Sequence, residues 1–129
     1  MKHKKRTGEM PVPGVRAVQA LLEHAPQRIR QVMYAGELSG ARGAVVEQAR
    51  LMGVKLNAVQ AKVLDERFEG VRHQGVMALV APAEYVDWPA LIAEPDALVL
   101  AVDQVTDPRN LGAMLRSAEA MRATGALLT

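Results

Sequence analysis

The sequence contains no cysteine, which excludes disulfide bonds, cysteine-ligated zinc sites and thiol catalysis. It has no apolar run close to the about 20 residues that a membrane-spanning helix needs, and its first residues lack the apolar stretch of a secretory signal. Aromatic residues make up only 3% of the chain, so a binding surface built on aromatic stacking has few side chains available. These absences predict a cytoplasmic protein that does not contact membranes.

The chain does contain enough apolar material for a folded core. Half of its 129 residues are apolar, which excludes general disorder. The formal net charge is +2, but four basic residues lie within residues 1–6, and without those four, 12 basic side chains oppose 14 acidic ones. The basicity is therefore confined to a tail, which is either a solvated N-terminus or an electrostatic arm for phosphate groups.

Helical and strand patterns alternate along the chain. Apolar spacing predicts helices over residues 15–25, 41–52, 60–67 and 111–122, and short apolar runs predict strands over 29–35, 54–59, 76–80 and 98–102, with another beginning at 126. The alternation predicts the α/β class, with a small domain on a mixed or parallel sheet followed by the first β-α-β piece of a second domain.

The same patterns divide the chain into four segments. We expect a basic flexible tail over residues 1–12, a first domain over 13–82, a linker over 83–96 and the beginning of a second domain over 97–129. A β-α-β half-unit exposes helix and sheet faces that further elements should cover. The sequence is therefore expected to stop inside the second domain.

Residues 103–118 carry the side chains best suited to chemistry. They follow a predicted buried strand at its carboxyl end, where open α/β sheets place their ligands. Asn110 lies at the expected N-cap position of the following helix. Arg109 and Arg116 are permanent cations whose forked guanidinium groups suit phosphate. The pattern predicts an anion near a helix N-terminus, with a capped helix and two surface arginines as the alternative. Two aspartates on this loop are too few for a metal site, so no metal is expected.

Several stretches resemble one known family. Residues 110–118, preceded by Asp107 and Pro108, resemble the first conserved motif of the SpoU (TrmH-like, SPOUT) RNA ribose 2′-O-methyltransferases. Residues 14–22 and 73–76 resemble the small RNA-substrate-binding domain of the branch that methylates a guanosine ribose in large-subunit ribosomal RNA. The resemblance runs from about residue 13 to the last residue.

The resemblance implies a specific chemistry. Members of the family bind S-adenosylmethionine in the trefoil knot of the catalytic domain, work as homodimers and need no metal. Their first motif supplies an Asn and an Arg near the target ribose, which correspond to Asn110 and Arg116. Because the guanidinium of arginine has a pKa above about 12, Arg116 is expected to position phosphate and stabilise charge rather than to accept a proton. Asn110 is expected to hold the loop and to orient Arg116.

Contacts to RNA are expected at five residues. The resemblance assigns Arg16, Arg72, His73 and Gln74 to the substrate-binding domain, and Arg109 lies beside the catalytic motif. The alternatives are that the arginines are dispersed over the surface and that His73 is a structural hydrogen-bonding residue.

The second and third motifs of the family, which form the knot and the donor pocket, are not found in the sequence. We therefore expect the N-terminal part of a methyltransferase, inactive alone, with no cofactor-binding residues and no bound S-adenosylmethionine. A non-catalytic RNA-binding module and a decayed gene product are the alternatives.

Overall fold

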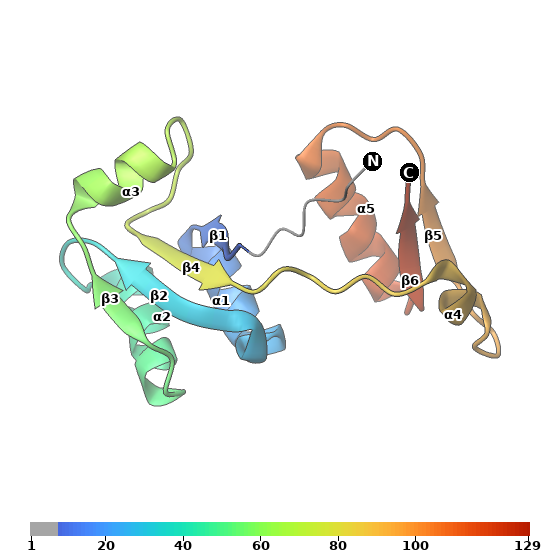
Figure 1. Cartoon of the computed structure of the whole chain (residues 1–129), viewed down its shortest axis with the longest axis horizontal. Helices are drawn as coiled ribbons and strands as arrows, with labels where there is room; N and C mark the ends of the chain where they lie inside the picture. Colours follow the sequence, from blue (N-terminus) through green and yellow to red (C-terminus); the bar gives the residue numbers. More distant parts are fainter. Residues whose placement is uncertain (1–7) are drawn as a thin grey trace. The chain divides into compact units, whose positions relative to one another are not determined.

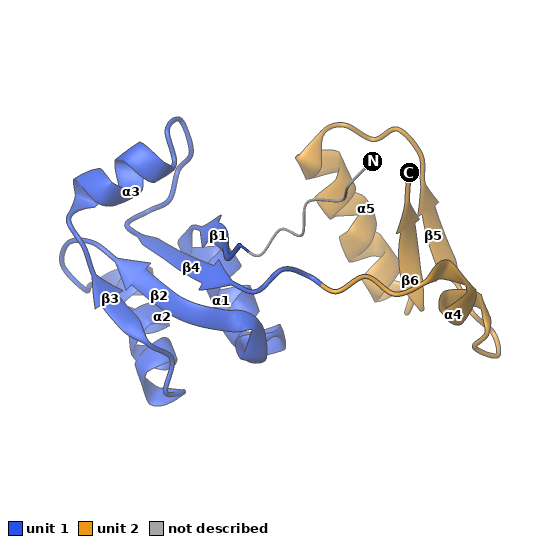
Figure 2. Cartoon of the chain, in the orientation of Figure 1, with its two compact units in different colours: residues 1–83 blue, residues 84–129 orange. Residues whose placement is uncertain are grey.

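A computed structural model describes residues 8–129, and the chain divides into unit 1, residues 1–83, and unit 2, residues 84–129 (Figures 1 and 2). The basic residues 1–6 of the predicted tail lie outside the described residues. Residues 10–12 were expected in the same tail, and this prediction is wrong because they belong to strand β1 (Met10–Pro13). The prolines of β1 are tolerated because this strand lies at the edge of its sheet.

Unit 1 is built on a four-stranded mixed sheet in the order β1-β4-β2-β3. Strand β4 pairs antiparallel with both β1 and β2, whereas β2 pairs parallel with β3. After β1 the elements are α1 (Val15–His24), a 3₁₀ turn (Pro26–Arg28), β2 (Ile29–Tyr34), α2 (Gly40–Leu51), β3 (Leu56–Ala58), α3 (Ala61–Arg67) and β4 (Val76–Val80). The predicted mixed-sheet α/β fold is confirmed.

Three of the four strands of unit 1 run in the same direction. Both β1 and β2 are antiparallel to β4, and β3 is parallel to β2, so β1, β2 and β3 end at one edge of the sheet. Helices α1, α2 and α3 follow these strands, and β4 begins at the same edge. This edge, called the carboxyl edge below, therefore gathers three helix N-termini and the loop of residues 68–75.

The core of unit 1 lies on both faces of β4, whose five residues are all buried. On one face, side chains of α1 and α2 pack against Val76, Ala78 and Val80. On the other face, Leu64 of α3 packs with Met33 of β2, with Ala35 directly after β2, and with Met77 and Leu79 of β4. Because both faces are covered, β4 reads in the sequence as one continuous apolar run.

Unit 2 consists of α4 (Trp88–Ile92), β5 (Val99–Val102), α5 (Pro108–Ala120) and β6 (Gly125–Leu128). Strands β5 and β6 are parallel, which confirms the predicted β-α-β piece. Val102 is the one buried residue of unit 2. No helix among residues 8–129 has the length and apolar character needed to cross a bilayer.

Candidate functional site

Three of the residues expected to contact RNA line a single hollow of unit 1. The hollow has a volume of about 470 Å³ and lies at the carboxyl edge. It is lined by Pro13 at the end of β1, by Gly14, Arg16 and Ala17 at the beginning of α1, and by Arg72 and Gln74 from the loop before β4. The pairing of β1 with β4 brings these segments together, although they are far apart in the sequence.

Gln74 ties the two sides of this hollow together. Its side-chain oxygen Oε1 accepts a hydrogen bond of 3.3 Å from the backbone N–H of Val15, the first residue of α1. The N-cap residue Gly14 has no side chain to cap the helix, and its own N–H donates to the carbonyl of Val76 at 2.9 Å. Gln74 thus supplies from a distant loop one of the acceptors that the first turn of a helix needs.

The two arginines of the hollow carry charge that no neighbouring acid neutralises. Among residues 8–129, neither Arg16 nor Arg72 forms an ion pair, and both side chains are exposed. By contrast, Arg50 lies 2.6 Å from Glu47, and its hydrogen bond to this carboxyl lowers the pKa of Glu47. Two guanidinium groups without acidic partners make the hollow a suitable site for phosphate oxygens.

His73 lies between Arg72 and Gln74 in the sequence but does not line the hollow. Its Nε2 lies 2.8 Å from Oδ1 of Asp65 on α3, and its Nδ1 accepts a hydrogen bond of 3.0 Å from the N–H of Gly75. The side chain is only 15% exposed, and its ring centroid lies 6.3 Å from that of Phe68. Both ring nitrogens therefore have partners within unit 1.

The catalytic motif proposed from the sequence lies at the beginning of α5, and its capping differs from the prediction. The N-cap is Asp107, whose Oδ1 accepts a hydrogen bond of 2.8 Å from the N–H of Arg109. Asn110 is the third residue of the helix, so the prediction that it is the N-cap is wrong. Pro108 explains the difference, because its fixed φ and missing N–H favour the first helical position directly after an Asp cap.

Arg109 and Arg116 lie on the same face of α5. Seven residues make close to two turns of an α-helix, so their side chains leave the helix within about 20° of each other. A Cβ atom at Gly112, between them, would lie 4.0 Å from Nη1 of Arg116. The Arg116 side chain therefore runs back across Gly112 toward the beginning of the helix, the usual direction for long side chains.

Asn110 faces a different side of the helix. It is six residues before Arg116, which places the two side chains about 120° apart around the axis. Both are exposed, and among the described residues no hydrogen bond joins them. The expected orientation of Arg116 by Asn110 thus stays a prediction.

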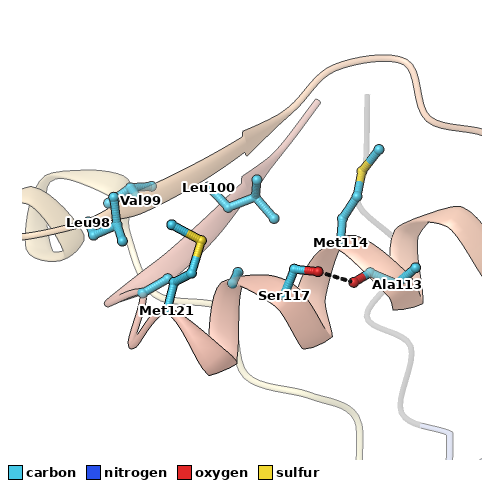
Figure 3. A pocket seen from close by; sticks show the side chains of 9 residues that line it. Leu98, Val99, Leu100, Ala113, Met114, Ser117 and Met121 are labelled. Atoms are coloured by element: carbon cyan, nitrogen blue, oxygen red, sulfur yellow. Dashed lines mark hydrogen bonds between the residues drawn. The ribbon is translucent and has the colours of Figure 1, made fainter.

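A second hollow, of about 400 Å³, lies between α5 and β5 within unit 2 (Figure 3). Its lining is almost wholly apolar and comprises Leu98, Val99, Leu100, Ala113, Met114, Ser117, Ala118, Met121 and Ala123. The hydroxyl of Ser117, its one polar side chain, donates to the carbonyl of Ala113 at 3.1 Å. This hollow offers no charged group to a ligand, and the described residues contain no cluster of acids and histidines able to hold a metal ion.

Comparison with known proteins gives a consistent result. Residues 11–86 match the family model described as RNA 2′-O ribose methyltransferase substrate binding (SpoU_sub_bind). The 23S rRNA (guanosine-2′-O-)-methyltransferase RlmB of Shewanella oneidensis is 38% identical over 120 residues, covering 89% of this chain and 49% of that protein. The Escherichia coli protein of the same name is 41% identical over 112 residues, covering 83% of this chain and 46% of the relative.

A solved structure extends the similarity to both units. The SpoU methyltransferase AviRb from Streptomyces viridochromogenes, crystallised in complex with the cofactor AdoMet, matches with a TM-score of 0.63 and 29% identity. The match covers 97% of this chain and 46% of AviRb. The chain thus spans about half the length of the curated relatives and of the structure that it matches.

Proposed function

Because the chain belongs to the SpoU family of RNA ribose 2′-O-methyltransferases, we propose that it recognises large-subunit ribosomal RNA through unit 1 and contributes the first catalytic motif through unit 2. The reaction is transfer of a methyl group from S-adenosylmethionine to the 2′-hydroxyl of a guanosine, in the cytoplasm and by a homodimer. The names of the relatives support the substrate, and the hollow between Arg16 and Arg72 is the observation that carries RNA binding.

In unit 1, the proposed contacts are to phosphate and to the shape of the RNA rather than to stacked bases. Arg16 and Arg72 would each hold a phosphate oxygen of the backbone, and the side-chain amide of Gln74 lies beside them. Exposed aromatic side chains, the usual platforms for unstacked bases, are absent from the lining of this hollow. Recognition by backbone charge and helical shape is the mode that such a lining supports.

In unit 2, Arg109 and Arg116 are proposed to bind the phosphates that flank the target ribose. Their shared helix face and the small residue Gly112 between them leave room for a sugar-phosphate backbone. An arginine stays protonated throughout, so Arg116 would stabilise developing negative charge and hold the 2′-hydroxyl in place. Asn110 would hold the beginning of α5 near the target nucleotide.

The hollow of unit 2 does not fit the methyl donor. S-adenosylmethionine carries an ammonium, a carboxylate and a sulfonium, which need polar partners, whereas the hollow of unit 2 offers only apolar side chains and an already bonded hydroxyl. We therefore propose no step through the donor on these residues. The same observation favours a second candidate, an RNA-binding module that does not catalyse.

The first test is binding of the 129-residue chain to a hairpin of 23S rRNA at several salt concentrations. We expect salt-sensitive binding, and we expect the double variant Arg16→Ala, Arg72→Ala to lower the slope of log K against log salt by about 2, one for each lost phosphate contact. Arg50→Ala is the control for each lost charge, because it removes one positive charge from an arginine that is already paired with Glu47, and its effect is compared with half of the loss in the double variant. Equal losses in Arg50→Ala would show unspecific attraction and would contradict the proposal.

The second test is isothermal calorimetry of the same chain with S-adenosylmethionine. We expect no saturable heat of binding, because the donor's charged groups find no partners in the apolar hollow. Saturable binding would contradict this expectation and would show that this polypeptide contains a binding site for the donor. Binding of RNA without binding of the donor would favour the non-catalytic module for this polypeptide.

A further inference from the structure

The contacts of His73 form a support for the loop of residues 68–75, which lines the proposed RNA site. The N–H of Gly75 donates to Nδ1 of His73 at 3.0 Å, so Nδ1 carries no proton and Nε2 is the ring donor. Nε2 faces Oδ1 of Asp65 at 2.8 Å. The imidazole thus joins α3 on one side to the backbone just before β4 on the other.

This support fixes the backbone at the residues that line the hollow. Gln74 has a φ of 54° and Gly75 a φ of 74°, a left-handed pair that a free chain seldom adopts when one residue carries a side chain. The hydrogen bond from Gly75 to His73, two residues earlier, closes this turn. His73 is held to α3 by Asp65, and its two sequence neighbours, Arg72 and Gln74, line the hollow. The contact of His73 with α3 therefore restricts where these two residues can lie.

A second contact from another helix holds the same turn. A Cβ atom at Gly75 would overlap the guanidinium of Arg42, and it would lie 3.1 Å from the carbonyl oxygen of Ala35. The N–H of Ala35 also donates to the carbonyl of Gly75 at 2.9 Å. Gly75 is therefore held between Arg42 of α2 and Ala35, which directly follows β2, so the end of the loop next to β4 is fixed.

We propose that Asp65 and His73 are positioning residues, which hold Arg72 and Gln74 in place for RNA, and that His73 makes no contact with the RNA. This inference rests on the proposed function, because it assumes that the hollow binds RNA. It assigns to Asp65, an exposed acid on α3, a role in binding a polyanion. Removal of this carboxylate is therefore expected to weaken RNA binding. Removal of a carboxylate that only repelled the RNA would strengthen binding instead.

The test compares two neighbouring acids on α3, each measured for binding to the 23S rRNA hairpin. Asp65→Ala and Glu66→Ala remove one negative charge each, and Glu66 lies near Lys62 at 3.6 Å rather than near His73. We expect Asp65→Ala to weaken RNA binding about 5- to 30-fold, roughly the loss of one charge-assisted contact. Glu66→Ala is expected to leave the affinity unchanged or to raise it up to about twofold, since a repelling charge is lost.

Two further measurements separate positioning from folding. Asp65→Asn keeps an oxygen that can accept from Nε2, so it should restore the affinity that Asp65→Ala loses. The amide resonance of Gly75 should shift in Asp65→Ala and return in Asp65→Asn, while thermal unfolding of both variants stays close to that of the unmodified chain, because this pair is largely exposed on the Asp65 side.

The outcomes are distinguishable from those of the proposed function. If Arg72→Ala weakens RNA binding but Asp65→Ala behaves like Glu66→Ala, the positioning inference is overturned while the RNA site stands. If Arg72→Ala leaves binding unchanged, the hollow is not the RNA site, and the inference is overturned with it. A loss in Asp65→Ala that Asp65→Asn fails to restore would also overturn the role of the hydrogen bond.

Discussion

Replacing Leu64 by alanine is expected to lower the free energy of unfolding of unit 1 by about 2–5 kcal/mol. Leu64 has no exposed surface and is the one buried residue of α3. Its side chain packs against Met33, Met77 and Leu79 on the face of the sheet that α1 and α2 leave open. Urea denaturation of the 129-residue chain, followed by circular dichroism, measures the change.

The adjacent residue provides the control for this experiment. Val63 is 42% exposed, so Val63→Ala removes apolar atoms from the same helix with little cavity formation and should cost less than about 1 kcal/mol. If the two variants have the same stability, α3 does not pack as described. Because α3 carries Asp65, looser packing of this helix in Leu64→Ala should also weaken RNA binding.

The second large effect is expected at Arg116. In a preparation of the protein that transfers methyl groups to RNA, Arg116→Gln should lower the rate about 100- to 1,000-fold, the usual effect of removing one group that stabilises charge in a transition state. The affinity for RNA should fall much less, by under about tenfold, because other arginines contribute to binding. Transfer of radiolabelled methyl groups and a binding assay on the same RNA measure the two effects.

Arg122→Gln is the matched control for this variant. Arg122 follows α5, is exposed and forms no ion pair among the described residues, and it lies at the opposite end of the helix from the motif. It should leave both the rate and the affinity nearly unchanged. Equal losses of rate and affinity in Arg116→Gln would make Arg116 a binding residue without a role in the reaction.

Most strands and helices of unit 1 are predictable from the sequence, because the spacing of their apolar residues matches the positions that are buried in the structure. The helix predicted over residues 15–25 ends at His24, before Pro26, and the apolar run from Val76 to Val80 is the doubly covered β4. Strand β1 was missed because Pro11 and Pro13 are typical of loops. Only the position at the edge of the sheet, which a single sequence does not reveal, makes these prolines acceptable in a strand.

The candidate site was predictable in part, and mainly through the family resemblance. Nothing in the local sequence shows that Gln74 accepts from the N–H of Val15, because this contact depends on the pairing of β1 with β4. The N-cap at Asp107 is predictable from the sequence, since an Asp followed by Pro is a strong signal for the beginning of a helix. The pairing of His73 with Asp65 depends on the position of α3 beside the loop, which sequence spacing alone does not give.

The order of strands in unit 1 also constrains how the chain acquires its shape during translation. Strand β4 is the last strand of the unit to leave the ribosome, yet it is the partner of both β1 and β2. A nascent chain that ends before Val76 can form only the short parallel pair of β2 and β3. Strand β1 therefore cannot pair before β4 has been synthesised, so the sheet of unit 1 forms late in translation. Its formation depends on contacts between residues far apart in the sequence, and folds with such contacts form slowly.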